Sequence, residues 1–239
     1  EMVVENRTPE DAAQIVQRIC GVCPVSHSHA STIAAEKAYG IEISNNARII
    51  RNLIEGAQFL HSHILWFYNL AALDYVNPLN ALDADVADAY ALAQEANTSM
   101  NSDLGALKER LKKFADNGQL SIFSGNWFPT KNQYADGSNE YTLPPELDLI
   151  CTAHYLEALK MQAKASEVAA LLGGKMPHVM TVIPGGTSFV PTEQKLDDLK
   201  YLVDEIYDWV ESTMIPDTLD IAPDYKAALE WGKGCGRYI

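Results

Sequence analysis

Cysteine is scarce in this sequence, and so are positive charge and long apolar runs. Four cysteines in 239 residues are too few for the disulfide-rich scaffold of a small secreted domain. No run of about 18 apolar residues occurs, so no membrane-spanning helix is predicted. The formal net charge of -14 argues against nucleic acid and against an anionic membrane surface as partners. The 47% of hydrophobic residues nevertheless predicts a globular protein with a substantial core.

Helical periodicity dominates the chain. Thr8 followed by Pro9 is typical of a capped helix start, and apolar residues recur at three- and four-residue spacing in the later segments. The apolar run 179–183 predicts a short strand, and the polar segment 125–145 predicts a long loop. Helices are expected at about 8–18, 26–39, 44–72, 83–116 with a break near 97–101, 145–172 and 192–216. The sequence therefore predicts a mainly α fold with long helices, a few short strands and long loops.

Both ends of the sequence read as the interior of longer elements. Residues 1–5 do not look like a start, and the last residues stop as a new segment begins. We therefore expect residues 1–239 to form a single, partial domain of a larger catalytic subunit.

Two thiols three positions apart, Cys20 and Cys23, are the chemically most informative feature. A redox dithiol of this spacing usually follows a strand, whereas a helix is predicted here. A structural zinc site needs two more ligands. His27 and His29 are two positions apart on a predicted helix, so only one of them can point toward the thiols, and the chain has no second C-x-x-C. The third alternative is half of a thiolate site whose other ligands lie elsewhere.

The residues around these cysteines resemble a known family. Arg18, Cys20, Cys23 and His27 form the pattern R-x-C-G-x-C-x-x-x-H, which resembles the N-terminal cysteine motif of the nickel–iron hydrogenase large subunit. Further segments resemble family sequence in the same order along nearly the whole chain: 6–9, 29–32, 50–53, 60–64, 67–68, 72–74, 153–159, 173–178 and 215–217. The resemblance implies the long-helix bundle of that subunit.

The resemblance also implies a nickel–iron centre that cleaves H2 reversibly and heterolytically to protons and electrons. In the family, two C-x-x-C motifs supply four sulfurs to nickel, and one sulfur of each pair bridges to an iron that carries carbon monoxide and cyanide. By matching position, Cys20 would be a terminal nickel ligand and Cys23 a bridging one. Soft thiolates suit a metal that changes oxidation state and holds hydride, and a terminal thiolate can take up the proton.

Other residues match family positions outside the metal-ligand pair. His27 would hydrogen-bond a bridging sulfur, and Arg18 would lie near the buried site, unless it is a helix-end cation that faces water. Glu1 matches a ligand of a structural magnesium ion. Lys175 and His178 match a motif on the side that faces the iron–sulfur clusters of the small subunit, the partner that the resemblance implies.

The chain departs from the family pattern in several places. The second cysteine pair and the upstream proton-relay glutamate are absent, so the chain alone is expected to be inactive. Ser62 stands where the family commonly has Asp, which removes a carboxylate from around the active site.

Two alternative functions remain open from the sequence. One is a non-catalytic relative, such as the quinone-site subunit of complex I, although that relative lacks the nickel-binding cysteines. The other is a zinc-binding interaction module. Localisation is open as well, because family large subunits are exported with the small subunit's signal; the periplasmic side is favoured over the cytoplasm.

Overall fold

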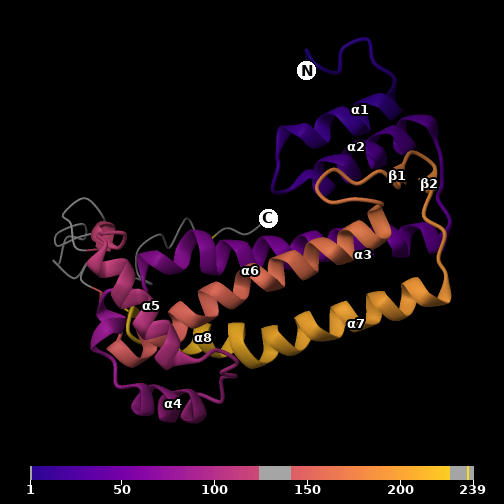
Figure 1. Cartoon of the computed structure of the whole chain (residues 1–239). Helices are drawn as coiled ribbons and strands as arrows, with labels where there is room; N and C mark the ends of the chain where they lie inside the picture. Colours follow the sequence, from indigo (N-terminus) through magenta and orange to yellow (C-terminus); the bar gives the residue numbers. More distant parts are fainter. Residues whose placement is uncertain (1, 124–140, 227–235, 237–239) are drawn as a thin grey trace. The chain divides into compact units, whose positions relative to one another are not determined.

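The computed structural model describes residues 2–123, 141–226 and 236. Helices form nearly all of the regular structure in this part of the chain (Figure 1). The α-helices are α1 (Pro9–Val16), α2 (Pro24–Tyr39), α3 (Asn45–Ile64), α4 (Val86–Glu95), α5 (Leu104–Asp116), α6 (Pro145–Gly173), α7 (Glu193–Trp209) and α8 (Ile215–Ile221), and the strands are β1 (Val182–Ile183) and β2 (Gly186–Thr187). The mainly α prediction is therefore confirmed.

The chain divides into two compact units. Unit 1 comprises Glu1–Trp66 and Leu159–Tyr207, and unit 2 comprises Phe67–Ala158 and Asp208–Ile239. The prediction of a single partial domain remains a prediction. Within the described residues, no helix is long and apolar enough to cross a membrane.

Short-range signals set the helix ends in unit 1. The Thr8 hydroxyl accepts a hydrogen bond from the Asp11 amide at 3.2 Å, which caps α1 as the sequence predicts. Ser44 caps α3 in the same way, through the Ala47 amide at 3.2 Å. Helix α2 ends at Gly40, whose φ of 69° lies in the left-handed region that glycine adopts without steric cost. Helices α1 and α2 pack against each other (Figure 1).

A buried ion pair connects α2, α3 and the β1–β2 hairpin of unit 1. Arg51 is 1% exposed, and its Nη1 donates to Glu36 Oε2 at 3.0 Å. Its Nε donates to the Gly186 carbonyl at 2.9 Å, and its Nη2 donates to the Ile183 carbonyl at 2.6 Å. Burial raises the pKa of Glu36, but hydrogen bonds from Arg51 and from the Gly185 amide outweigh burial and lower it. The hairpin is therefore held by side-chain chemistry rather than by its two short strands.

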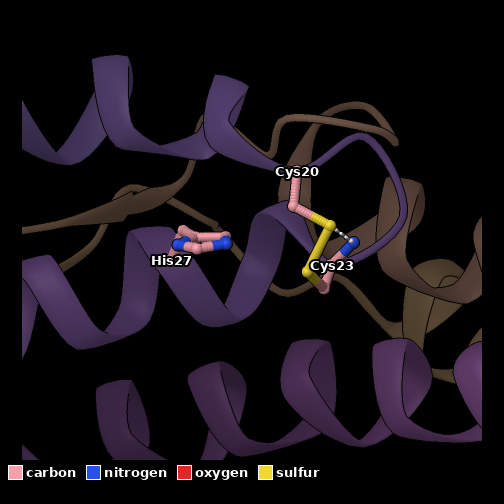
Figure 2. A group of neighbouring side chains, drawn as sticks. All are labelled: Cys20, Cys23 and His27. Carbon is pink, nitrogen blue, oxygen red and sulfur yellow. Dashed lines mark hydrogen bonds between the residues drawn. A yellow bond between two sulfur atoms is a disulfide. The ribbon is translucent and has the colours of Figure 1, made fainter.

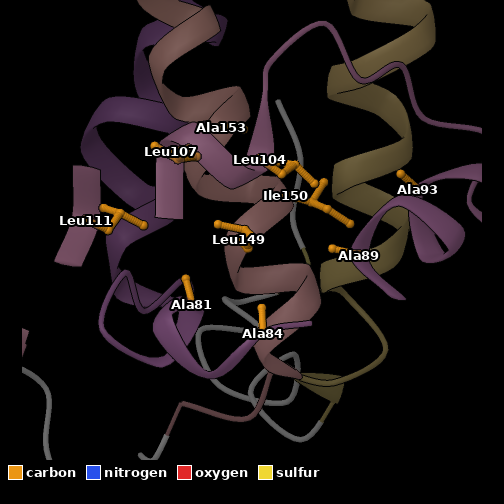
Figure 3. Close-up of a cluster of buried hydrophobic side chains, with 10 residues drawn as sticks. All are labelled: Ala81, Ala84, Ala89, Ala93, Leu104, Leu107, Leu111, Leu149, Ile150 and Ala153. Carbon is orange, nitrogen blue, oxygen red and sulfur yellow. The ribbon is translucent and has the colours of Figure 1, made fainter. Parts of the chain in front are cut away.

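Alanine and leucine side chains form the core of unit 2. Helices α4, α5 and the first half of α6 bring them together with the 3-10 turn at Asn80–Asp83 (Figure 3). The small alanines allow the backbones to approach closely, and leucines fill the remaining volume. The buried residues are Ala81, Ala84, Ala89, Ala93, Leu104, Leu107, Leu111, Leu149, Ile150 and Ala153.

Three predicted elements differ in their extent. The helix predicted at 44–72 consists of α3 and a π-helical stretch at Leu65–Ala71. The helix predicted at 192–216 consists of α7, a π-helical stretch at Val210–Met214, and α8. Pro216 does not end this helix but lies in the first turn of α8, where its missing amide N–H costs nothing. The strand predicted at 179–183 is reduced to Val182–Ile183. Most of the predicted loop at 125–145 lies outside the described residues.

His154 in unit 2 is buried between hydrogen-bond acceptors on both sides. Its Nδ1 lies 2.9 Å from both carboxylate oxygens of Asp217, and its Nε2 lies 3.0 Å from the Ser99 carbonyl oxygen. A carbonyl and an ionised carboxylate can only accept, so these partners favour an imidazole that carries a proton on both ring nitrogens and is therefore charged. Burial opposes this charge, but Asp217 outweighs burial and raises the pKa of His154 above its usual 6.5. Tyr68 donates a further hydrogen bond to Asp217 at 2.8 Å.

We expect His154→Gln to destabilise the chain most strongly in mildly acidic solution. The variant leaves the Asp217 carboxylate buried without its counter-charge, which typically costs about 3–5 kcal/mol. Because the folded pKa is raised, the charged pair contributes fully below the unfolded value of about 6.5 and loses its contribution as the pH rises through the folded pKa. Urea unfolding between about pH 5.5 and 9 measures the difference. His63→Gln, at an exposed position, is the control; a difference that does not depend on pH would contradict a charged His154.

Candidate metal centre

A tight elbow between α1 and α2 places Cys20 and Cys23 together. Helix α1 tightens into a 3-10 turn at Gln17–Ile19, and Cys20 then leaves it in an extended conformation. Cys23 is the N-cap residue of α2, and Pro24 occupies the first helical turn, where proline favours the start of a helix. The connection between two helix ends is short, so the two cysteine Cα atoms lie only 5.4 Å apart.

In this structure the sulfurs of Cys20 and Cys23 are joined as a disulfide (Figure 2). The Cys23 amide donates a hydrogen bond to the Cys20 sulfur at 3.1 Å. Both side chains are partly exposed, so a reductant can reach them. A disulfide sulfur is not a thiolate, so metal binding requires reduction of the pair. After reduction, the N-terminus of α2 favours negative charge on the sulfurs.

His27 lies one turn into α2, on the side of the cysteines (Figure 2). One donor atom from each of Cys20, Cys23 and His27 lies within 4.8 Å of the others. The structure therefore brings together the three residues of the predicted C-x-x-C-x-x-x-H motif. Two thiolates and an imidazole are soft or borderline donors, which fit nickel and also zinc. Within the described ranges, no fourth Cys, His or carboxylate joins this cluster.

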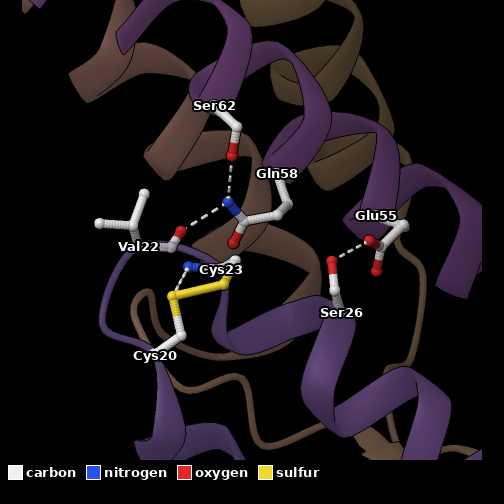
Figure 4. The surroundings of a disulfide bond; sticks show 7 residues. All are labelled: Cys20, Val22, Cys23, Ser26, Glu55, Gln58 and Ser62. Carbon is white, nitrogen blue, oxygen red and sulfur yellow. Dashed lines mark hydrogen bonds between the residues drawn. A yellow bond between two sulfur atoms is a disulfide. The ribbon is translucent and has the colours of Figure 1, made fainter. Parts of the chain in front are cut away.

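Helix α3 supports the elbow through polar contacts that the sequence did not reveal (Figure 4). Gln58 is 2% exposed, and its Nε2 donates to the carbonyl oxygen of Val22, between the cysteines, at 2.6 Å. The same nitrogen donates to the Ser62 hydroxyl at 2.8 Å. The Ser26 hydroxyl, in the first turn of α2, donates to the carboxylate of Glu55. The only sequence signal for Gln58 is a polar residue on the apolar face of a predicted helix, next to Ala57.

The other predicted site residues lie outside the cysteine–histidine cluster. Arg18 is exposed, and its Nη1 donates to the Gln14 carbonyl at 2.5 Å, which matches the alternative of a helix-end cation. Lys175 is exposed as well. Slight burial, together with the charges of Arg18 and Lys175, lowers the pKa of His178, so these three residues are electrostatic neighbours. Glu1, the predicted magnesium ligand, lies outside the described residues.

The family model described as nickel-dependent hydrogenase matches residues 1–239. The chain belongs to the nickel-dependent hydrogenase family. The Hydrogenase-2 large chain of Escherichia coli (strain K12) is 39% identical over 250 residues, which cover 100% of this chain and 43% of that relative. The uptake hydrogenase large subunit of Rhizobium leguminosarum bv. viciae is 37% identical over 252 residues, covering 100% of this chain and 41% of the relative.

Solved hydrogenase structures share the fold. The Ni-Fe-Se hydrogenase from D. vulgaris Hildenborough in its as-isolated oxidised state matches with a TM-score of 0.72 and 32% identity, over 98% of this chain and 39% of that chain. The chain thus spans about two fifths of the length of the hydrogenase relatives described here. These relatives give no support to the zinc-module or complex I alternatives.

We expect the reduced, metal-free chain of this hydrogenase family member to bind one nickel ion through the elbow. Titration with Ni²⁺ should produce a sulfur-to-nickel charge-transfer absorption that saturates at one ion per chain, because the two thiolates lie together there. Cys20→Ser or Cys23→Ser should remove most of this absorption. Cys151→Ala, which removes the buried cysteine of unit 2, should leave it intact; absorption that depends on Cys151 instead would contradict the assignment.

Proposed function

We propose that this chain is part of the catalytic large subunit of a [NiFe]-hydrogenase, which cleaves H2 reversibly into protons and electrons. The observation that carries the proposal is the convergence of Cys20, Cys23 and His27 within 4.8 Å at the elbow. Membership of the nickel-dependent hydrogenase family over the whole chain supports it. The remaining nickel ligands belong to sequence outside this chain.

The two cysteines would hold the metal centre after reduction. Cys20 would be a terminal ligand of nickel, and Cys23 would bridge nickel and an iron with carbon monoxide and cyanide ligands. When bound, this centre supplies the redox chemistry of H2 cleavage. The Cys20 sulfur would take up the proton that leaves H2, because a terminal thiolate keeps a lone pair for it. His27 would donate a hydrogen bond to the bridging sulfur and so reduce its basicity.

The electrons released would leave through a partner subunit that carries iron–sulfur clusters. The positive charges of Arg18 and Lys175 next to His178 in unit 1 support a partner surface at these residues, because the whole chain is strongly negative. Glu1 would contribute to a structural magnesium site. The large subunit would enter its compartment together with the partner and its export signal.

The nickel content of the complete protein tests the ligand assignment. Cys20→Ser and Cys23→Ser proteins, purified with the partner subunit, should retain less than about a tenth of the wild-type nickel and show no H2-dependent dye reduction, since hydroxyl oxygen is a poor ligand for this soft site. The 239-residue chain alone should also be inactive, because two thiolates are too few for the centre.

Cys151→Ala in the same complete protein is the matched control and should keep wild-type nickel, because Cys151 is buried in unit 2 and belongs to no group of three metal-binding side chains among the described residues. Unchanged nickel in the Cys20 and Cys23 variants, or H2-dependent dye reduction by the chain alone, would refute the proposal.

A further inference from the structure

The Gln58 side chain forms a polar link between α3 and the loop that joins the two cysteines (Figure 4). Its Nε2 donates to the Val22 carbonyl at 2.6 Å and to the Ser62 hydroxyl at 2.8 Å. Val22 is the residue that directly precedes Cys23, so this contact restrains the loop between the ligands. Both protons of the amide nitrogen are used by these two acceptors.

The orientation of the Gln58 amide follows from its partners. The Val22 carbonyl can only accept, so it must face the amide nitrogen and not the amide oxygen. The Oε1 atom is consequently buried and has no hydrogen-bond partner among the described residues. An unpaired buried acceptor destabilises the folded state. An apolar side chain of the same length would avoid this cost, so helix packing alone does not explain a glutamine at this position.

We propose that Gln58 is a positioning residue for Cys20 and Cys23 and acts through the Val22 carbonyl. The proposal rests on the proposed function, in which these two sulfurs hold the metal centre. Restraining the loop keeps both sulfurs at the elbow in the reduced, metal-free protein, so that less conformational freedom is lost when the metal binds.

Ser62 completes this arrangement. Its hydroxyl accepts the second amide proton of Gln58 and holds the side chain in the rotamer that reaches Val22. It stands where the family resemblance predicts Asp. A serine at this position retains the acceptor that Gln58 needs but adds no negative charge beside the two thiolates.

Gln58→Met tests the proposal because methionine has the same length but no donor. In the reduced, metal-free chain, the Cys23 amide should exchange its hydrogen about threefold to tenfold faster than in wild type, the factor expected for one lost hydrogen bond. Alkylation of the Cys20 and Cys23 thiols by iodoacetamide should accelerate by a similar factor.

Matched variants distinguish a local effect on the cysteine loop from a general destabilisation of unit 1. Gln194→Met places the same substitution at an exposed position of unit 1 and should change neither rate. Gln58→Asn keeps the amide but is too short to reach Val22, so it should accelerate both rates even if the methionine variant fails to fold. Ser62→Asp keeps an acceptor and should retain the wild-type exchange rate.

Wild-type exchange and alkylation rates in both Gln58 variants would overturn the proposal, and so would an equal acceleration throughout unit 1. The assay contains no metal, so its outcome is independent of the ligand assignment. Failure of that assignment would instead appear as unchanged nickel in the Cys20→Ser and Cys23→Ser proteins.

Discussion

The site depends on the elbow that joins the end of α1 to the start of α2. A C-x-x-C sequence in an extended chain spreads its sulfurs, whereas a turn between two helix ends brings them to one point. Here the 3-10 turn at Gln17–Ile19 ends the first helix and Pro24 starts the second. The same geometry places His27 one turn later on the side of the sulfurs, so one local conformation assembles all three donors.

Long-range polar contacts then hold this local conformation in place. Gln58 binds the loop from α3, and the Arg51–Glu36 pair connects α2, α3 and the hairpin. Buried polar groups of this kind are costly unless they are paired. The Gln58 contact restrains the loop of the elbow, and the Arg51–Glu36 pair fixes the C-terminal part of α2 against α3 and the hairpin.

Sequence reasoning succeeded where the signal was local. The capping Thr8, the helix end near residue 39 and the cysteine motif are each defined by a few neighbouring residues, and the structure confirms the first two. The motif residues also converge as a cluster, although their metal-binding roles stay predictions. The family was identified from the resemblance of many short segments along the whole chain, none of which is decisive by itself.

Features that depend on distant pairing were not predictable in the same way. Arg51 finds its carbonyl acceptors more than a hundred residues away in the hairpin, and no periodicity identifies such partners. The helix predicted at 192–216 continues past Pro216, because a proline without an amide donor fits the first turn of α8 after the π-helical stretch. The disulfide state of the cysteine pair is likewise not contained in the motif.

The central claim is that the Cys20 sulfur is a ligand of nickel. Selenocysteine in place of Cys20, in the complete protein with its partner subunit, allows a direct measurement by X-ray absorption at the nickel edge. The account predicts a selenium scatterer in the first coordination shell of nickel, and no selenium signal when selenocysteine replaces Cys151 instead. A nickel-loaded protein whose first shell lacks selenium from position 20 would contradict the account.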